Sequence, residues 1–134
     1  MSATVLDSFA LIAFFRAEAG HAIVAARLER AGERDIPVLM TEVNYAEVKY
    51  MIIRKDGVEH WDAIARELPT LPIEFHPITH ELADIAANYK VRCRLSLADA
   101  FAAALAKVKK AELVTGDHEF EAVAGEIKIA WLSV

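Results

Sequence analysis

Four carboxylates in the chain stand beside hydrophobic segments, at positions where strands end and helices begin. Asp7 closes the apolar run ATVLD, and Asp117 follows ELVTG near the other end of the chain. Asp99 lies three residues after Ser96 at the start of an alanine-rich helical segment, and Glu47 lies within a longer one. Carboxylate oxygens gathered in one place bind hard divalent cations, so these residues are candidates for a metal site.

Three of these acids also have an ordinary structural explanation. Asp7 and Asp117 can each cap the helix that follows, by accepting a hydrogen bond from a free backbone N–H group. Ser96 and Asp99 match the capping box, in which serine is followed three residues later by an acid. Considered one at a time, helix capping explains these residues better than chemistry does.

Glu47 is not explained by capping. On a helix its neighbours three and four positions away are mostly apolar: Val43, Asn44, Tyr50 and Met51. This pattern places Glu47 in a stripe that we expect to be buried. An unpaired buried carboxylate costs on the order of several kcal/mol or becomes protonated. A functional carboxylate and a structural salt bridge to an arginine both remain open.

The elements that must position these acids alternate between short strands and helices. Apolar runs predict strands at residues 3–7, 37–40, 71–77, 112–116 and 127–132. Helical periodicity predicts helices at residues 8–20, 21–33, 41–56, 58–68, 79–92 and 96–109, with a short one at 118–124. Such alternation favours an α/β fold with three layers, in which a parallel sheet is covered by helices on both faces.

In such a sheet, ligands bind beyond the carboxyl ends of the strands. Asp7 and Asp117 end strands, while Glu47 and Asp99 lie in helices that follow strands, so all four fall on one edge. Two like charges about 4 Å apart repel by about 4 kcal/mol at an effective dielectric constant of about 20. The arrangement therefore predicts divalent cations that hold the acids together.

The type of ligand predicts the type of metal and of reaction. All-carboxylate sites suit Mg²⁺ or Mn²⁺, and the five histidines show no paired spacing that would favour zinc. Acids with such cations are the usual equipment for phosphodiester hydrolysis. No glycine-rich phosphate loop and no Gly-x-Ser-x-Gly motif is present, so nucleotide-binding and serine-hydrolase sites are unsupported.

Bulk composition sets wider limits. The chain has 134 residues, which predicts one domain over 1–134, and its formal net charge is −5. That charge argues against a nucleic-acid partner, unless cations neutralise a cluster of acids. Basic residues gather locally, as at Arg92 and Arg94, and each group is more often a solvated helix end than a phosphate contact. A single cysteine and no long apolar run predict a cytoplasmic protein with no membrane span.

At this point the motifs resemble a known family. TVLDSFALIAFF, VNYAEVKY, LSLADAFAAALA and LVTGDHEF are similar, in this order, to segments of the PIN domain family, and most closely of its small single-domain ribonuclease toxins of VapC type. The resemblance implies a central, mostly parallel five-stranded sheet flanked by helices. It also implies a metal-dependent endoribonuclease that uses Mg²⁺ or Mn²⁺.

By position, the family's acidic quartet corresponds to Asp7, Glu47, Asp99 and Asp117. Thr115 matches the hydroxyl residue beside the quartet, and Ser8 follows the first acid as it often does in these toxins. The family often has a further aspartate two residues after the last one. Glu119 stands there instead, which retains the charge but leaves its role as a ligand in question.

The resemblance further implies partners: an RNA substrate, a second copy of the chain in a homodimer, and a cognate antitoxin of a VapBC-type pair. Two rival hypotheses remain. The chain could be a housekeeping RNA-processing nuclease without an antitoxin, or a non-catalytic PIN-like or receiver-like regulatory module. A complete quartet argues against the second.

Overall fold

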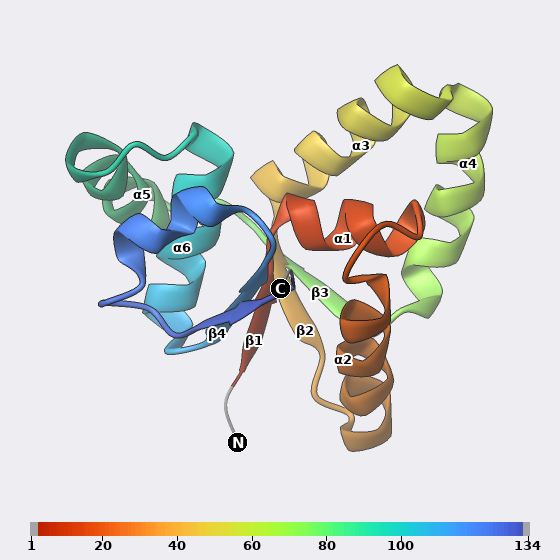
Figure 1. The fold of residues 1–134 in the computed structure, drawn as a ribbon, viewed down its shortest axis with the longest axis horizontal. Coiled ribbons are helices and arrows are strands. Elements are labelled where there is room, and N and C mark those ends of the chain that lie inside the picture. Colours follow the sequence, from red (N-terminus) through yellow and green to blue (C-terminus); the bar gives the residue numbers. More distant parts are fainter. Residues whose placement is uncertain (1–2, 133–134) are drawn as a thin grey trace.

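The computed structural model describes residues 3–132, arranged as strands and helices in alternation (Figure 1). In chain order the elements are β1 (Thr4–Leu6), α1 (Ser8–Phe15), α2 (His21–Arg34), β2 (Val38–Thr41), α3 (Glu42–Asp56), α4 (Val58–Glu67), the 3-10 helix η1 (Leu68–Thr70), β3 (Ile73–His76), α5 (His80–Arg92), α6 (Leu97–Lys109), β4 (Glu112–Thr115), the 3-10 helix η2 (His118–Val123) and β5 (Ile129–Trp131).

The five strands form one sheet in the order β3-β2-β1-β4-β5, and every neighbouring pair is parallel. The predicted α/β class and parallel sheet are therefore confirmed. The chain first builds outward from β1 through β2 to β3, and later adds β4 and β5 on the other side of β1. The order thus reverses between β1 and β4, where open parallel sheets form a crevice beyond their carboxyl ends.

Two apolar clusters, one on each face of the sheet, make three layers. Val5, Leu39 and Leu113 belong to a cluster with residues of α5, α6 and η2. Their neighbours Leu6, Met40 and Val114 belong to a second cluster with residues of α1, α2, α3 and α4. Because successive side chains of a strand point to opposite faces, a sheet buried on both faces needs continuous apolar runs. Figure 1 shows α5 and α6 on one side of the sheet and α1 to α4 on the other.

Local chemistry explains where the helices begin. The side chains of Asp7, Thr41, Thr79 and Ser96 accept hydrogen bonds from the first turns of α1, α3, α5 and α6. Ala102, Ala103 and Ala106 of α6 are fully or almost fully buried, so their small side chains let α6 pack closely. None of the helices within residues 3–132 is both long and apolar enough to cross a membrane.

The predicted end of the first helix was wrong by five residues, and that of the second by one. Helix α1 ends at Phe15, five residues before Gly20, and a turn connects it to α2. Gly20 has a φ of 91° and precedes α2, so it caps the start of that helix and does not end α1. Helix α2 continues through Gly32 to Arg34.

Candidate metal centre at the carboxyl edge of the sheet

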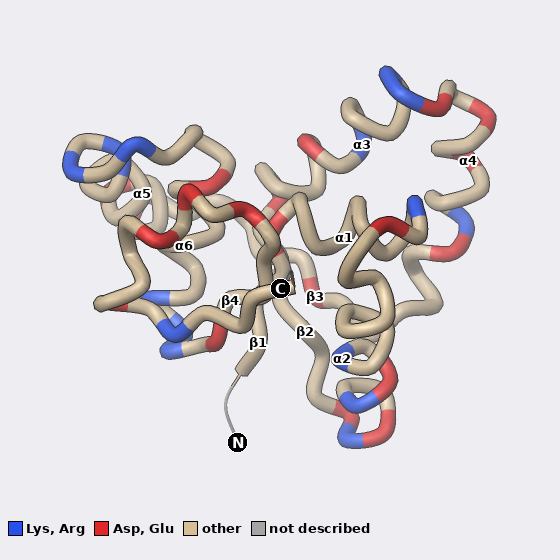
Figure 2. Tube along the Cα trace, in the orientation of Figure 1, with Lys and Arg blue, Asp and Glu red and all other residues tan. Residues whose placement is uncertain are grey.

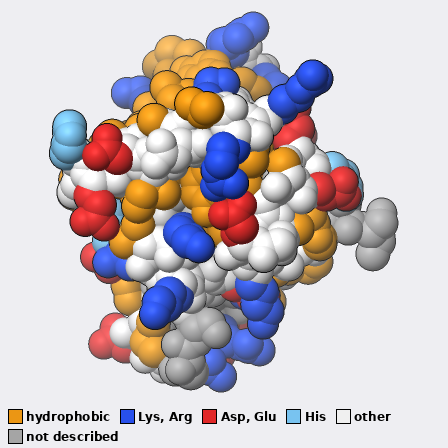
Figure 3. Space-filling model, turned by 90° about the vertical axis from the view of Figure 1, so that its left-hand side faces the viewer, with side chains coloured by type: hydrophobic (Ala, Val, Ile, Leu, Met, Phe, Trp, Pro, Cys, Tyr) orange, Lys and Arg blue, Asp and Glu red, His pale blue; other side chains and the backbone are white. Residues whose placement is uncertain are grey.

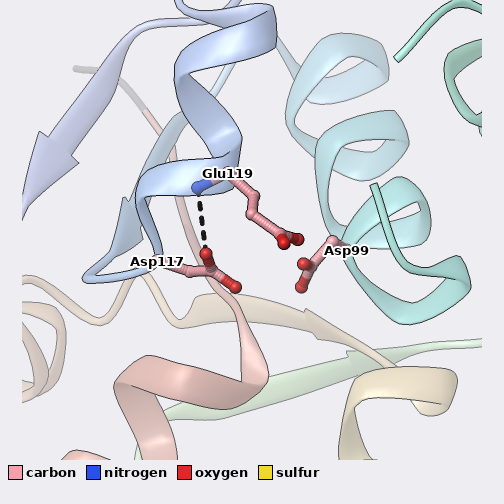
Figure 4. Close-up of side chains that lie close together, drawn as sticks. All are labelled: Asp99, Asp117 and Glu119. Atoms are coloured by element: carbon pink, nitrogen blue, oxygen red, sulfur yellow. Dashed lines mark hydrogen bonds between the residues drawn. The ribbon is translucent and has the colours of Figure 1, made fainter. Parts of the chain in front are cut away.

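Three carboxylates meet at the edge of the sheet where β1 and β4 end. One oxygen of each of Asp99, Asp117 and Glu119 lies within 4.8 Å of the others. Figure 4 shows Asp99 at the start of α6 and the other two at the start of η2, with their carboxyl groups turned toward one another. Figure 2 shows acidic positions along the same stretch of chain. Asp99 and Asp117 were predicted to lie together, and the structure confirms this.

Backbone and hydroxyl hydrogen bonds fix the segment that carries Asp117 and Glu119. The backbone N–H of Asp117 donates to Oγ1 of Thr115 at 3.0 Å. Oδ1 of Asp117 in turn accepts a hydrogen bond from the backbone N–H of Glu119 at 2.9 Å. Asp117 therefore caps η2, as predicted, and the same geometry leaves its second oxygen for a ligand.

Gly116 is needed here because of close packing and not because of a positive φ. The glycines with positive φ in the described part of the chain are Gly20 and Gly57. At Gly116 a Cβ atom would lie 2.3 Å from Cε1 of Phe9, because the phenyl ring packs directly on the backbone. Only a residue without a side chain lets Phe9 of α1 lie against the turn that positions Asp117.

Asp7 is 1% exposed and lies outside the group of three, yet near enough to Asp99 and Asp117 for their charges to act on it. Its Oδ1 accepts a hydrogen bond from the backbone N–H of Ala10 at 2.8 Å, and its Oδ2 accepts one from the hydroxyl of Thr115. Burial, reinforced by repulsion from Asp99 and Asp117, outweighs these hydrogen bonds and raises the pKa of Asp7 from 3.8 to about 8. Without a cation, Asp7 therefore holds a proton near neutral pH.

The pKa of Asp99 is raised as well. Asp99 is 8% exposed, and its backbone N–H donates to Oγ of Ser96 at 3.1 Å. The pKa of Asp99 is raised to about 7. Burial is the largest cause of this shift, followed by repulsion from Asp117, and Glu47 and Glu119 add smaller repulsions. A hydrogen bond from Ser96 opposes this shift without cancelling it. Ser96 therefore caps α6 as predicted, and this cap holds Asp99 at the crowded edge of the sheet.

The predicted burial of Glu47 was wrong. The buried residues of α3 are Asn44, Val48 and Ile52, and Glu47 flanks this stripe in a half-buried position. Its carboxylate is near enough to raise the pKa of Asp99, yet it lies outside the group of three. No lysine or arginine of residues 3–132 forms an ion pair with Glu47, so the structural salt bridge that remained open is not found there.

Asn44 is a buried residue of this edge whose role the sequence did not reveal. It is fully buried, and its Nδ2 donates to Oγ of Ser8 at 3.0 Å and to the carbonyl of Ala98 at 3.2 Å. The hydroxyl of Ser8 donates back to the carbonyl of Asn44 at 3.3 Å. One amide thus connects α1, α3 and α6 beside Asp7 and Asp99. Ser8, which directly follows Asp7, thus pairs with Asn44 through both its hydroxyl contacts.

The donor set of this edge fits a hard divalent cation. The group of three consists of oxygen ligands alone, without histidine or cysteine, which suits Mg²⁺ or Mn²⁺ better than zinc. Within residues 3–132, none of its carboxylates forms an ion pair with lysine or arginine. Like charges gathered without a protein cation need an external one, or they take up protons.

Comparisons with known proteins agree with this fold. The model of the PIN domain family matches residues 4–126. The chain is similar to the sarcin-ricin loop cleaving toxin VapC20 of Mycobacterium tuberculosis, with a TM-score of 0.72 and 21% identity over 94% of this chain and 98% of that one.

Two further solved structures are similar over nearly their whole length. DNA-bound VapBC2 of Rickettsia felis has a TM-score of 0.72 and 13% identity, over 95% of this chain and 96% of that one. VapBC-5 of Mycobacterium tuberculosis has a TM-score of 0.61 and 23% identity, over the full length of both chains. At these identities the likeness is one of fold. Among curated proteins nothing matches.

Proposed function

Because this chain belongs to the PIN domain family, we propose that it is a metal-dependent endoribonuclease and the toxin of a VapBC-type toxin–antitoxin pair. One observation carries the proposal. At the switch point of the sheet, Asp99, Asp117 and Glu119 converge near the buried Asp7, and the described residues supply no lysine or arginine to pair with them. Such a site is built to bind a cation that the chain does not itself provide.

We assign the cation to Asp99, Asp117 and Glu119, with Asp7 as a further proposed ligand. A divalent cation in such a site lowers the pKa of a coordinated water and offsets charge on the phosphate. Asp7 and Asp99, whose raised pKa values favour protonation near neutral pH, release their protons when the cation binds. Metal affinity is therefore expected to rise with pH.

The remaining polar residues position this set. The hydroxyl of Thr115 donates to the carboxylate of Asp7 and accepts a hydrogen bond from the backbone N–H of Asp117. This one hydroxyl therefore fixes the separation between Asp7, which follows β1, and Asp117, which follows β4. We propose that Glu47, half-buried near Asp99, holds the cation through a water or accepts a hydrogen bond from the attacking water. Ser8 acts through Asn44, because its hydroxyl is engaged there.

The proposed partners follow from the similar structures. One of these is a toxin described as cleaving the sarcin-ricin loop, and others are complexes of a toxin with its antitoxin. By analogy we propose RNA as the substrate and an antitoxin as the inhibitory partner. The homodimer is proposed from the resemblance to the PIN family alone. A housekeeping nuclease with the same chemistry would need no antitoxin.

Two experiments test these proposals. Purified protein is incubated with a panel of structured RNAs in Mg²⁺, Mn²⁺ or EDTA, beside Asp99→Asn and the control Asp84→Asn, which changes an exposed aspartate of α5. We expect metal-dependent cuts that Asp99→Asn loses and Asp84→Asn keeps. Cutting by Asp99→Asn at the rate of the parent would contradict the proposal.

Expression in cells separates a toxin from a housekeeping nuclease. A toxin should arrest growth, and coexpression of the neighbouring gene should relieve the arrest. Growth that is unaffected by an active nuclease would favour the housekeeping function.

A further inference from the structure

The connection between α5 and α6 forms a shallow hollow beside the carboxylates. The hollow has a volume of about 710 Å³ and is lined by residues 90–96 together with Glu119. One of its lining residues, Ser96, caps the helix whose first turn carries Asp99. The hollow therefore adjoins two members of the proposed metal-binding group.

The cations around this hollow differ in how they are engaged. The Nζ of Lys90 donates to the carbonyl of Leu95 at 2.8 Å, which ties the connection back onto α5. The guanidinium of Arg92 is paired with Glu126 at 3.2 and 3.3 Å. Arg94 is exposed and forms no hydrogen bond or ion pair with any residue of 3–132. Arg94 is thus the cation of this hollow that remains available to a ligand.

The surroundings favour a polyanion over a protein segment. Figure 3, which looks onto the α5 side of the molecule, shows lysine and arginine side chains gathered around apolar ones along its upper part. Figure 2 shows the end of α5 as basic, across from the acidic start of η2. An RNA strand that approaches the acids needs a counter-charge beside them, and a guanidinium can bind phosphate oxygens through two parallel hydrogen bonds.

We infer that this hollow is a phosphate subsite, in which Arg94 binds the RNA phosphate that neighbours the one at the carboxylates. The inference rests on the proposed ribonuclease function and makes Arg94 a positioning residue. The connection is held at both ends, by Lys90 on Leu95 and by Ser96 on Asp99, so a phosphate bound there is held in register with the metal-binding group. Contact with a phosphate carries no base specificity, so Arg94 contributes affinity for every sequence.

The test measures binding and cleavage separately. A labelled pool of random-sequence RNA is titrated in Mg²⁺ at several salt concentrations into Asp7→Asn protein, in which cleavage is expected to be blocked. Adding Arg94→Ala should weaken binding about 5-fold and reduce the slope of log affinity against log salt by about 0.7, the value for one phosphate contact of a single strand. Arg94→Lys should retain most of the affinity, because it keeps the charge.

The matched control is Arg30→Ala, which removes an exposed arginine of α2 that lines a different hollow. In active protein, Arg94→Ala should raise KM with kcat little changed, whereas Arg30→Ala should change neither. The inference is overturned if Arg94→Ala leaves affinity and salt slope unchanged, if Arg30→Ala lowers them equally, or if no RNA binds.

The outcomes for the subsite and for the proposed function are distinguishable. If the parent cuts no RNA while binding still depends on Arg94, the nuclease proposal fails and the anion subsite stands. If the parent cuts RNA and binding does not depend on Arg94, only the subsite fails.

Discussion

Strand β4 has carboxylates near both of its ends, and in the described chain only the one at its start is paired with lysine or arginine. At its start, Glu112 is paired with Arg27 at 2.7 Å and with Lys128 at 3.8 Å. Beyond its last residue, Asp117 meets Asp99 and Glu119, and no lysine or arginine of the described chain pairs with any of them. The same strand thus ends in a compensated carboxylate on one side and an uncompensated group on the other.

This difference separates a structural acid from a functional one. An acid that serves the fold is neutralised by the chain, because an uncompensated charge near the interior lowers stability. An acid group left without a cation, with the pKa of Asp7 and Asp99 raised to about 8 and about 7, is suited to an external ligand. We therefore expect substitution of the acids beyond the end of β4 to lower activity, and substitution of the paired acid at its start to lower stability.

The largest expected effect comes from replacing, in separate variants, the acid near each end of β4 by its amide. Asp117→Asn removes a proposed metal ligand and should lower kcat/KM by more than about 100-fold, the upper range for losing a group that only supports a metal site. Glu112→Gln should keep the activity and lower the free energy of unfolding by about 1 kcal/mol, since the pair with Arg27 is partly exposed. Initial rates and urea unfolding of both variants check this. Equal activity losses would remove the distinction between the edges.

The second prediction concerns the polar connection beneath the acids. Asn44→Ala removes the amide that joins Ser8 and Ala98, and leaves buried partners unsatisfied. We expect a loss of about 2 to 3 kcal/mol in the free energy of unfolding. Asn88→Ala, at an exposed position of α5, is the matched control and should change it by less than about 0.5 kcal/mol. Similar values for the two variants would show that Asn44 does not hold the edge together.

The third prediction is a pH dependence of the metal-free protein. Folding raises the pKa of Asp7 from 3.8 to about 8, so between these values the folded state binds more protons than the unfolded state. Stability must therefore fall as pH rises from about 4 to about 8, by on the order of several kcal/mol, and level off above that. Asp7→Asn should flatten this profile and stabilise the metal-free protein at pH 8. Unfolding midpoints in EDTA across this range are the measurement, and a profile that rises with pH would contradict the assignment.

The smallest effect is expected at the turn between β4 and η2. Gly116→Ala introduces a Cβ atom against the ring of Phe9 and should cost about 1 to 2 kcal/mol by overpacking. Phe9→Leu combined with it should recover part of that loss, because the shorter side chain leaves space. A double-mutant cycle of unfolding free energies measures the coupling between the two positions. Additive losses would mean that the ring contact does not explain the glycine.

The sequence predicted most of the fold and the main acids, because both depend on local patterns. Apolar runs ended by Asp7 and Asp117 indicated strand ends, and parallel topology then placed both acids at one edge. Three features depended on packing between distant segments and could not be predicted. The buried stripe of α3 passes through Asn44 and not Glu47, Asn44 bonds to residues 36 and 54 positions away, and Gly116 is required by Phe9. A single sequence does not specify such contacts.

The most direct test of the central claim is binding of Mn²⁺ or Mg²⁺ to the purified protein by isothermal titration calorimetry at pH 7.5, beside Asp99→Asn and Glu112→Gln. If the carboxyl edge is a metal centre, the parent and Glu112→Gln will bind the cation with similar affinity and release protons as they do so. Asp99→Asn will bind at least about 10-fold more weakly. Equal binding by all three proteins, or none by the parent, would contradict the account.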